Sequence, residues 1–529
     1  MRKAKSFIAV SIFALFVLAY AHTCSLSVTW KNFSEDSGDL LAAAFTLGIP
    51  HPTGYPLYVL LGRTFSLVMP GSIAFRITLL SILCASLAPV FLFLTLARLL
   101  PGRGALLGAA FASLSLGFSL HYWSQAVIAE VYALHLLLTS VVVYALVRWV
   151  HPEHSHNGDS EKPNTFLLLA AYALGLSFAN HMLSLVTLVF GAVLVLSGSG
   201  RKKLSLPLCL WTLASFLIPL TLYAYLPLRS MKNPPLDWGN PETWDQLRWV
   251  VTGAQYRFRF LGKPLLETLP RLWPGPFLST GSLVALLALA GLLCGKMSQA
   301  LRASLAAMLA ASLAVVILYD IPDFQAYFLP AVFAISLLAG AGFHRIVDAC
   351  EVLLQRTRRP VLVRYGVSVA AGLLLLAAIV PAARENRKET DASADLYPYV
   401  FGRATFRVVE PDALIVSEYD GRTFALWFFR EAEHRETHPG CIVVMKPLLV
   451  WPWYIDNLRK LYPDLVVPEA GLVDETAVLL VGSNIDTRPV YAVRDDPTLR
   501  QFFELRPVLG GLTPLFRVEK RIETQVPNE

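Results

Sequence analysis

The chain has 529 residues, of which 55% are hydrophobic and only 16% are charged. This composition leaves too little polar surface for a set of water-soluble domains, so most of the chain is expected to lie in lipid. The net charge of +7 does not indicate a nucleic-acid partner, because the lysines and arginines fall mostly in short loops between apolar segments, a pattern typical of membrane topology.

Eleven apolar stretches predict membrane-spanning helices. A bilayer core about 30 Å thick needs roughly 20 apolar residues per helical span, and backbone groups in lipid must pair within the chain. The predicted spans lie near residues 6–26, 73–97, 104–118, 125–147, 165–179, 182–197, 205–227, 277–295, 299–319, 325–346 and 362–382. Those at 104–118, 165–179 and 182–197 are short for a full crossing, so tilted or packed helices are expected there.

The distribution of positive charge predicts the orientation. With the N-terminus inside, lysines and arginines concentrate in the inner loops, and the C-terminal region lies outside the membrane. A second interpretation of the N-terminus stays open, since Arg2 to Lys5, an apolar core and Ala19-Tyr20-Ala21 resemble a secretory signal with a cleavage site.

The composition changes after Arg384, which divides the chain into a transmembrane domain, residues 1–383, and an extracytoplasmic α/β domain, residues 384–529. A polar linker is expected around residues 386–395. Short apolar runs predict strands at 413–417, 441–445, 477–481 and 490–493, with helices at 423–434 and 454–461. The predicted fold is therefore mainly α, a polytopic helical bundle with a small C-terminal α/β domain.

The first outer loop is the strongest candidate for chemistry. It crowds Glu35, Asp36 and Asp39 beside the bilayer, before a turn that contains His51 and Tyr55. A simpler alternative is that Asp36 and Asp39 cap a helix over residues 40–47. The prolines and glycine after His51 are equally compatible with a plain rigid turn.

Two further candidates lie at the outer ends of spans. Glu130 is an ionisable group at membrane depth, which is costly unless the group is paired or hydrated, so a functional role is the default hypothesis. A side chain reaching the interface is the alternative. His181 lies in a tight outer turn with Asn180, where a capping or interfacial role is also open, and Asp320 lies in another outer turn.

The long outer loop 228–276 contains Arg229, Asp237 and Trp238, followed by apolar residues at helical spacing from Trp244 to Ala254. Such a segment suits a helix in the interface plane. Arginine binds phosphate in a two-pronged, charge-assisted way, so the arginines of this loop predict a lipid phosphate ligand, with anionic headgroups in general as the alternative.

The candidates come from separate parts of the chain, yet the predicted topology places all of them at one surface. Transporters usually place their polar sites near the bilayer midplane within repeated halves. The sequence therefore favours a reaction at one interface, in which acidic and basic groups meet just beyond the lipid. The residues concerned are Asp36, Asp39, His51, Glu130, His181, Arg229, Asp237 and Asp320.

Several motifs resemble a domain-of-unknown-function family whose animal member is a protein O-mannosyltransferase. The family belongs to the GT-C glycosyltransferases, which take sugars from polyprenyl-phosphate carriers. The resemblance covers roughly residues 6–270 and is carried by Asp36-Ser37-Gly38-Asp39-Leu40, His51-Pro52-Thr53-Gly54-Tyr55-Pro56-Leu57, Trp123-Ser124-Gln125-Ala126, Glu130-Val131-Tyr132, Asn180-His181, Leu226-Pro227-Leu228-Arg229 and Asp237-Trp238-Gly239. Thr53 stands where a second proline is common and Asp39 where glutamate is common, departures that leave the carboxylate and the turn in place.

The resemblance implies an acidic general base in the first outer loop, a role that Asp36 matches best and Asp39 second. It implies that Arg229 stabilises the departing polyprenyl phosphate. The remaining matching residues are expected to contact substrate: His51, Tyr55, Glu130, His181, Asp237 and Trp238.

No metal ligands are predicted, since the six cysteines are scattered without ligand spacing. Some GT-C enzymes use a divalent cation and others do not, so a divalent cation stays open, and the expected partner molecule is the polyprenyl-phosphate sugar donor itself.

The predicted function is a membrane glycosyltransferase that transfers a sugar, with mannose as the candidate, to a hydroxyl of an exported protein or glycan, with inversion at the anomeric carbon. The expected location is a bacterial plasma (inner) membrane with the site on the extracytoplasmic side. The alternatives are a transporter or lipid flippase and a membrane-anchored receptor.

Overall fold

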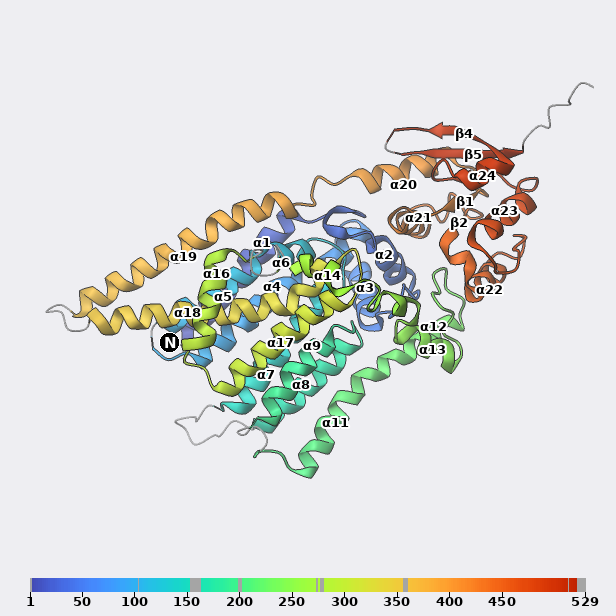
Figure 1. Ribbon diagram of the computed structural model, residues 1–529. Helices are drawn as coiled ribbons and strands as arrows, with labels where there is room; N and C mark the ends of the chain where they lie inside the picture. The colour runs from blue at the N-terminus through green and yellow to red at the C-terminus, as the bar shows by residue number, and fades with distance from the viewer. Residues whose placement is uncertain are drawn as a thin grey trace, which may run out of the picture. The chain divides into compact units, whose positions relative to one another are not determined.

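A computed structural model describes residues 2–102, 104–152, 163–197, 202–272, 275, 280–354, 360–511 and 513–520. The chain forms two compact units, each assembled from three segments (Figure 1). The helical unit contains Met1–Cys24, Thr78–Tyr223 and Tyr256–Ala392, and the mixed unit contains Ser25–Ile77, Ala224–Gln255 and Ser393–Glu529. The domain boundary predicted at residues 383 and 384 stays a prediction.

Long apolar helices make up the helical unit, as expected from the composition. The helices are α1 (Arg2–Thr23), α4 (Ile73–Leu99), α5 (Gly104–Gly117), α6 (Leu120–Ala126), α7 (Tyr132–Val150), α8 (Pro163–Phe178), α9 (Ser184–Leu196), α11 (Leu206–Leu220), α14 (Leu265–Thr268), α16 (Ser282–Cys294), α17 (Gln299–Leu318), α18 (Leu329–Leu354) and α19 (Pro360–Thr390). Short 3-10 helices η2 (Thr221–Ala224), η3 (Ala254–Arg259), η4 (Leu269–Leu272) and η5 (Phe324–Phe328) join some of them.

The chain is an integral membrane protein, but the predicted count of eleven spans is not confirmed. Among the described residues, seven helices are long and apolar enough to cross a membrane, or eight if α5 and α6, bent by 65°, form one span. The stretches predicted at 104–118, 165–179, 182–197 and 277–295 all contain helices, namely α5, α8, α9 and α16, but each of these has 16 residues or fewer. At 1.5 Å per residue, such helices are shorter than a bilayer core.

Glycines allow the central helix α18 to approach its neighbours closely. A Cβ added at Gly342 would meet the backbone of Leu287 in α16, and one added at Gly340 would meet the backbone of Gly108 in α5, both well inside 3.0 Å. Small residues at helix contacts are the usual route to tight packing in membranes, where apolar surface alone drives little association.

We expect Gly342→Ala to lower the stability of the helical unit by about 1–3 kcal/mol, because its methyl group would force α16 and α18 apart. Thermal unfolding in detergent, followed by tryptophan fluorescence, measures the effect. Gly372→Ala in α19 is the matched control, since its methyl group would meet no described atom within 4 Å. Equal unfolding temperatures for the two variants would contradict the packing argument.

In the mixed unit, a small sheet is combined with helices from all three segments. Its helices are η1 (Lys31–Phe33), α2 (Ser37–Thr46), α3 (Pro56–Val68), α12 (Tyr225–Ser230), α13 (Trp244–Val251), α20 (Tyr397–Val408), α21 (Asp420–Ala432), η6 (Lys446–Val450), α22 (Pro452–Leu461), α23 (Val473–Asn484) and α24 (Pro497–Phe502). The strands β1 (Leu414–Ser417), β2 (Ile442–Met445), β3 (Val490–Ala492), β4 (Phe503–Leu509) and β5 (Leu515–Lys520) follow the order β2-β1-β3-β5-β4. β2, β1 and β3 are parallel, and β5 is antiparallel to β3 and β4.

Most of the predicted C-terminal elements are confirmed. Strands β1, β2 and β3 and helices α21 and α22 lie where the sequence predicts them. The strand predicted at 477–481 is wrong, because these residues lie inside α23; a short apolar run does not distinguish a buried helix from a buried strand. The linker expected around 386–395 is helical as far as Thr390, the end of α19, and β4 and β5 were not predicted.

The first-loop helix α2 packs directly on α21 of the C-terminal segment. Residues 37–44 are all buried, which explains why residues 40–44 are all apolar. At Gly38, an added Cβ would meet the backbone of Phe424, so glycine is required for the close contact. The first outer loop and the C-terminal residues therefore share one core.

Candidate active site

Asp39 and His51 form a buried pair at the centre of the mixed unit. Asp39 lies in the first turn of α2, and its side chain is fully buried. Its Oδ2 atom accepts a hydrogen bond from the backbone N of His51 at 2.9 Å and lies 2.8 Å from His51 Nδ1. A buried carboxylate that accepts two such bonds fixes both the turn and the direction of the imidazole ring.

The second nitrogen of His51 faces two more partners. His51 Nε2 lies 2.9 Å from the hydroxyl of Tyr55 and 3.6 Å from Oδ2 of Asp36. The Tyr55 hydroxyl donates to the carbonyl oxygen of Pro52 at 2.9 Å, so its oxygen is the acceptor in the contact with Nε2 when that nitrogen carries a proton. The imidazole thus lies between two carboxylates.

Asp36 and Asp39 differ sharply in exposure. The Asp36 side chain is 41% exposed, whereas that of Asp39 is 0% exposed. Asp36 occupies the N-cap position of α2, as the capping alternative predicted, but its carboxylate lies beside His51 and does not bond to the first turn. Of the two predicted catalytic carboxylates, Asp36 is therefore the one with access to a substrate, and Asp39 holds His51.

The turn from His51 to Pro56 is shaped by its glycine and tyrosine. Gly54 has φ +81°, and an added Cβ would lie 2.9 Å from the side chain of Leu226 in α12. Tyr55, with φ 42°, is the N-cap of α3, and Pro56 opens the helix where no backbone donor is needed. The turn is rigid, as the alternative interpretation held, and it also delivers the Tyr55 hydroxyl to His51.

Arg229 lies at the end of α2 and makes contacts that the sequence did not predict. Its Nε donates to the carbonyl oxygen of Leu47 at 2.7 Å, and its Nη2 to that of Thr46 at 3.3 Å. Arg63 donates to the carbonyl oxygen of Phe45. The two arginines thus satisfy the last carbonyls of α2, where positive charge is favourable. The predicted phosphate contact of Arg229 stays a prediction.

Asp237 and Trp238 are joined to the first loop by backbone hydrogen bonds. Ile49 donates from its backbone N to Leu236 at 2.7 Å, and Trp238 donates to Ile49 at 3.1 Å. Asp237 accepts a bond from Ser230 Oγ at 2.9 Å. Burial raises the pKa of Asp237 to about 6, although the bond from Ser230 opposes the shift.

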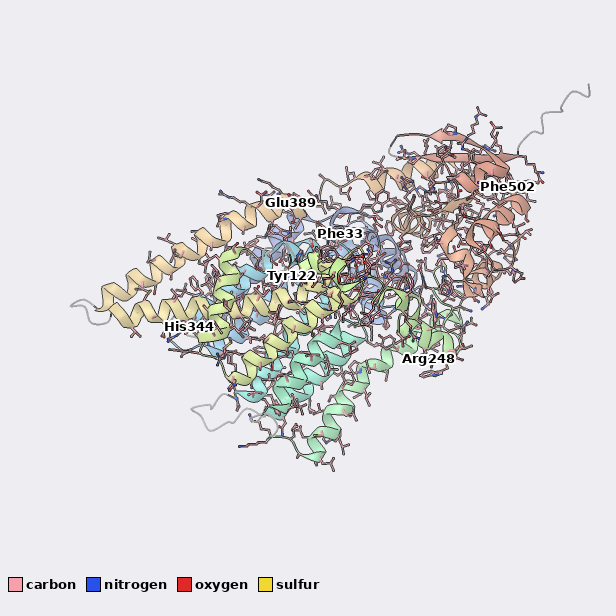
Figure 2. The ribbon with its side chains drawn as sticks, in the orientation of Figure 1. Phe33, Tyr122, Arg248, His344, Glu389 and Phe502 are labelled. Atoms are coloured by element: carbon pink, nitrogen blue, oxygen red, sulfur yellow. The ribbon has the colours of Figure 1, made fainter. Side chains whose placement is uncertain are left out.

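The ring of Trp238 is part of an aromatic cluster in the mixed unit. Its centroid lies 6.2 Å from that of His51 and 5.9 Å from that of Trp453, and its indole N donates to Gln255 at 2.8 Å. The helix expected after it is present as α13, begun by a reciprocal cap between Thr243 and Gln246. Arg248, labelled in Figure 2, is exposed on α13, as an interfacial helix requires.

Glu130 and His181 lie in the helical unit. Glu130 is 6% exposed, and its backbone exchanges weak hydrogen bonds with Ser81. His181 Nδ1 accepts a bond from the backbone N of Leu183 at 3.0 Å, which leaves the proton on Nε2. Its ring lies against that of Tyr132, with centroids 5.2 Å apart. His181 is therefore a hydrogen-bond donor in this tautomer.

Asp320 lies in a cationic cluster of the helical unit. Its carboxylate pairs with Arg271 and lies 3.3 Å from Lys263 Nζ, and its carbonyl oxygen accepts from Arg259 at 3.3 Å. The hydrogen bond from Arg271 holds the pKa of Asp320 below its usual range. Two cations contact the carboxylate and a third contacts the backbone of the same residue.

Sequence reasoning missed His135, Trp427, Trp453 and Glu431. His135 is fully buried and lies 3.2 Å from Ser177 Oγ, beside the turn that carries His181. It follows Glu130 by five residues, and this closeness in sequence to a candidate residue could have indicated it. The other three line a cavity with Asp39 and Asp237, and nothing in the local sequence relates them to residues nearly 200 or more positions earlier.

Across the described ranges, no group of three or more histidine, cysteine, aspartate or glutamate side chains is arranged to hold a metal ion. The dependence of the protein on a divalent cation therefore stays open.

The shifted pKa of Asp237 predicts a dependence of stability on pH. Because the folded-state value of about 6 exceeds the ordinary value of 3.8, the folded chain binds more protons than the unfolded chain between about pH 4 and pH 6. The free energy of unfolding should therefore fall as pH rises through this window, by about 3 kcal/mol in total.

Asp237→Asn removes this titration and should be more stable than the unmodified chain at pH 7.5, with the advantage shrinking towards pH 4. Thermal unfolding of both chains at several pH values between 4 and 7.5 measures the difference. A difference that stays constant over this range would show that Asp237 does not titrate as its burial requires.

Comparisons with known proteins support the predicted resemblance. Residues 36–204 match the family model described as Protein O-mannosyl-transferase TMEM260 N-terminal domain. The chain is 30% identical over 237 residues to Protein O-mannosyl-transferase TMEM260 of Mus musculus, a match that covers 44% of this chain and 32% of the mouse protein. The chain thus spans about a third of this relative's length.

Solved structures share the fold. ArnT from Cupriavidus metallidurans bound to undecaprenyl phosphate matches with a TM-score of 0.63 at 13% identity over 98% of both chains. The archaeal oligosaccharyltransferase AglB from Archaeoglobus fulgidus, in complex with an inhibitory peptide and a dolichol-phosphate, matches with a TM-score of 0.53 at 12% identity over 99% of this chain and 75% of AglB. The predicted fold class, a mainly α transmembrane bundle with a small C-terminal α/β body, is confirmed, and the chain shares the fold of these glycosyltransferases.

Proposed function

We propose that this chain is a membrane glycosyltransferase that transfers a sugar from a polyprenyl-phosphate carrier to a hydroxyl group of a protein. The fold and the match over residues 36–204 support this class of reaction. The carrier is inferred from the undecaprenyl phosphate and dolichol-phosphate named for the structural neighbours. Mannose as the sugar and protein as the acceptor follow from the name of the mouse relative.

The observation that carries the proposal is the difference between the two first-loop carboxylates. Asp36 is 41% exposed and lies beside His51, whereas Asp39 is buried and bonded to His51. A carboxylate that removes the proton of an attacking hydroxyl must be reachable by that hydroxyl, so Asp36 is proposed as the general base. Asp39, through His51, is a positioning residue.

In the proposed reaction, the acceptor oxygen attacks the anomeric carbon as Asp36 takes its proton, and the bond from that carbon to the phosphate oxygen breaks. The single displacement inverts the anomeric configuration. His51, bonded to Asp39, lies 3.6 Å from the Asp36 carboxylate that receives the proton and so positions it.

Positive charge must stabilise the departing phosphate, on which negative charge grows. Arg229 keeps this role as a proposal, although its guanidinium also satisfies the carbonyls that end α2.

The proposed location is a plasma membrane of bacterial type, with the mixed unit on the extracytoplasmic side. This rests on the distribution of lysines and arginines between the loops. The mouse relative is eukaryotic, and the equivalent eukaryotic placement would be the luminal face of an internal membrane.

The decisive experiment measures transfer from a radiolabelled polyprenyl-phosphate mannose to a serine- and threonine-containing peptide, with the full chain in lipid nanodiscs. We expect Asp36→Asn to lower the turnover number by about 10²–10⁴-fold, because a general base contributes a factor of this size. The KM for the donor should change much less, since the substitution is nearly isosteric.

Glu35→Gln is the matched control, because Glu35 is the neighbouring first-loop carboxylate and has no proposed role. It should transfer sugar at the normal rate. If Asp36→Asn is as active as Glu35→Gln, Asp36 is not the base; if the unmodified chain transfers no sugar from any polyprenyl-phosphate donor, the proposed reaction itself fails.

A further inference from the structure

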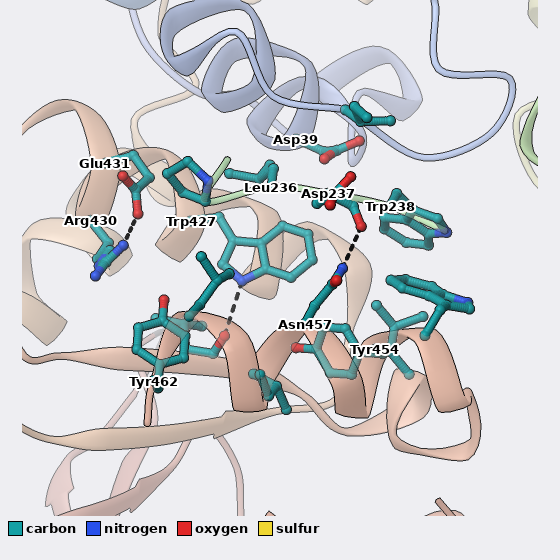
Figure 3. Close-up of a pocket in the computed structure, with 17 residues that line it drawn as sticks. Asp39, Leu236, Asp237, Trp238, Trp427, Arg430, Glu431, Tyr454, Asn457 and Tyr462 are labelled. Carbon is teal, nitrogen blue, oxygen red and sulfur yellow. Dashed lines mark hydrogen bonds and ion pairs between the residues drawn. The ribbon is translucent and has the colours of Figure 1, made fainter. Parts of the chain in front are cut away.

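A small cavity lies inside the mixed unit, between the first loop, the segment 235–238 and the C-terminal α/β body. Its volume is about 50 Å³, and both Asp39 and Asp237 line it (Figure 3). Glu431, on α21, lines it from another side. By volume, it holds a group of one or two heavy atoms, roughly the size of an ammonium or methylammonium ion.

Each of these three carboxylates leaves one buried oxygen without a hydrogen-bond partner among the described residues: Asp39 Oδ1, Asp237 Oδ1 and Glu431 Oε2. The residues are 0%, 7% and 4% exposed. The second carboxylate oxygens of Asp39 and Asp237 already accept hydrogen bonds. Asp39 Oδ2 accepts from His51, and Asp237 Oδ2 accepts from Ser230. Among the described lining residues, the indole N of Trp453 is the buried donor without a partner, against three unpaired carboxylate oxygens. Buried carboxylate oxygens are costly to leave unpaired, so the cavity has an excess of acceptors that a donor ligand would satisfy.

The charge around the cavity points to a positive ligand. Arg430 is the cation among its lining residues, and it pairs with Glu431 and donates to the carbonyl oxygen of Cys441. Asp39 and Asp237 are left as further carboxylates on the wall. Burial also raises the pKa of Asp237 to about 6, and the charges of Lys460 and Arg229 oppose the shift without cancelling it.

Aromatic rings form much of the remaining wall. Trp238 lies against Trp427 and Trp453, with ring centroids 6.3 Å and 5.9 Å apart, and all three line the cavity. The faces of indole rings attract organic cations, and carboxylates beside them are the usual partners for an ammonium group. A metal ion is less suited, because no set of three ligating side chains is close enough to hold one among the residues described.

We propose that this cavity, the ammonium pocket, binds a primary ammonium group through Asp39, Asp237 and the surrounding indole rings. The same chemistry is found in a lysine side chain of a protein acceptor and in an amino sugar. The lysine source rests on the proposed function. In that case, the protein would recognise its acceptor partly through a lysine near the hydroxyl that receives the sugar. Trp427 and Trp453 are only half-buried, which gives a small ligand a route to the pocket.

The test uses the purified full chain and methylammonium as the probe, with tryptophan fluorescence as the readout. We expect a saturable change, and at least a tenfold weaker affinity for Asp237→Asn. That variant is expected to be more stable than the unmodified chain at neutral pH, so a loss of binding would not reflect unfolding. Asp245→Asn, which removes an exposed carboxylate of α13, is the matched control and should bind normally.

Further arms distinguish the sources of the ammonium group. The binding of a lysine-containing peptide is compared with that of its acetyl-lysine form. The binding of glucosamine is compared with that of N-acetylglucosamine. The comparison in which acetylation abolishes binding identifies the source. Asp36→Asn should bind as the unmodified chain does, so binding is separable from transfer. Three outcomes would overturn the proposal. The first is the absence of saturable binding, and the second is an unchanged affinity in Asp237→Asn. The third is occupation of the pocket by calcium or magnesium alone at a lower concentration than methylammonium requires.

Discussion

The pairing of Asp39 with His51 is the interaction on which the mixed unit depends. A single carboxylate oxygen accepts both the backbone N and the ring of His51, twelve residues further along the chain, and so closes the first loop on itself. The closed loop then presents Ile49 for backbone pairing with residues 236–238 and directs the other side of the imidazole towards Asp36. Without this bond, neither the position of the proposed base nor the wall of the ammonium pocket would be defined.

Four acidic residues in the mixed unit show how environment divides similar groups among different tasks. Asp36 is partly exposed beside a histidine, a setting for proton transfer. Asp39 is buried and engaged, a setting for orientation. Asp237 is buried with a single hydroxyl donor to its carboxylate, which raises its pKa, and Glu431 is buried beside an arginine. Their exposure and bonding differ because the fold solvates and pairs each one differently.

The sequence predicted the parts of the fold that local pattern determines. Long apolar runs gave helices, and β-branched runs in the C-terminal region gave β1, β2 and β3. The strand expected at 477–481 was wrong because a five-residue apolar run fits a helix equally well. First-loop motifs indicated Asp36, Asp39 and His51, but the bonds among them follow from how the loop closes. The contacts of Arg229 with the end of α2 join residues 182 or more positions apart, and no local pattern encodes such a distance.

The contact of Gly38 with Phe424 bears on how the protein is made. Residues 25–77 leave the ribosome early, yet the partners that complete their core are synthesised only after most of the apolar helices of the chain. Because chain segments emerge in order, at roughly 5–20 residues per second, the first loop waits on the order of tens of seconds for its packing partners. During biosynthesis, the first loop therefore completes its packing only after Phe424 and its neighbours have been made.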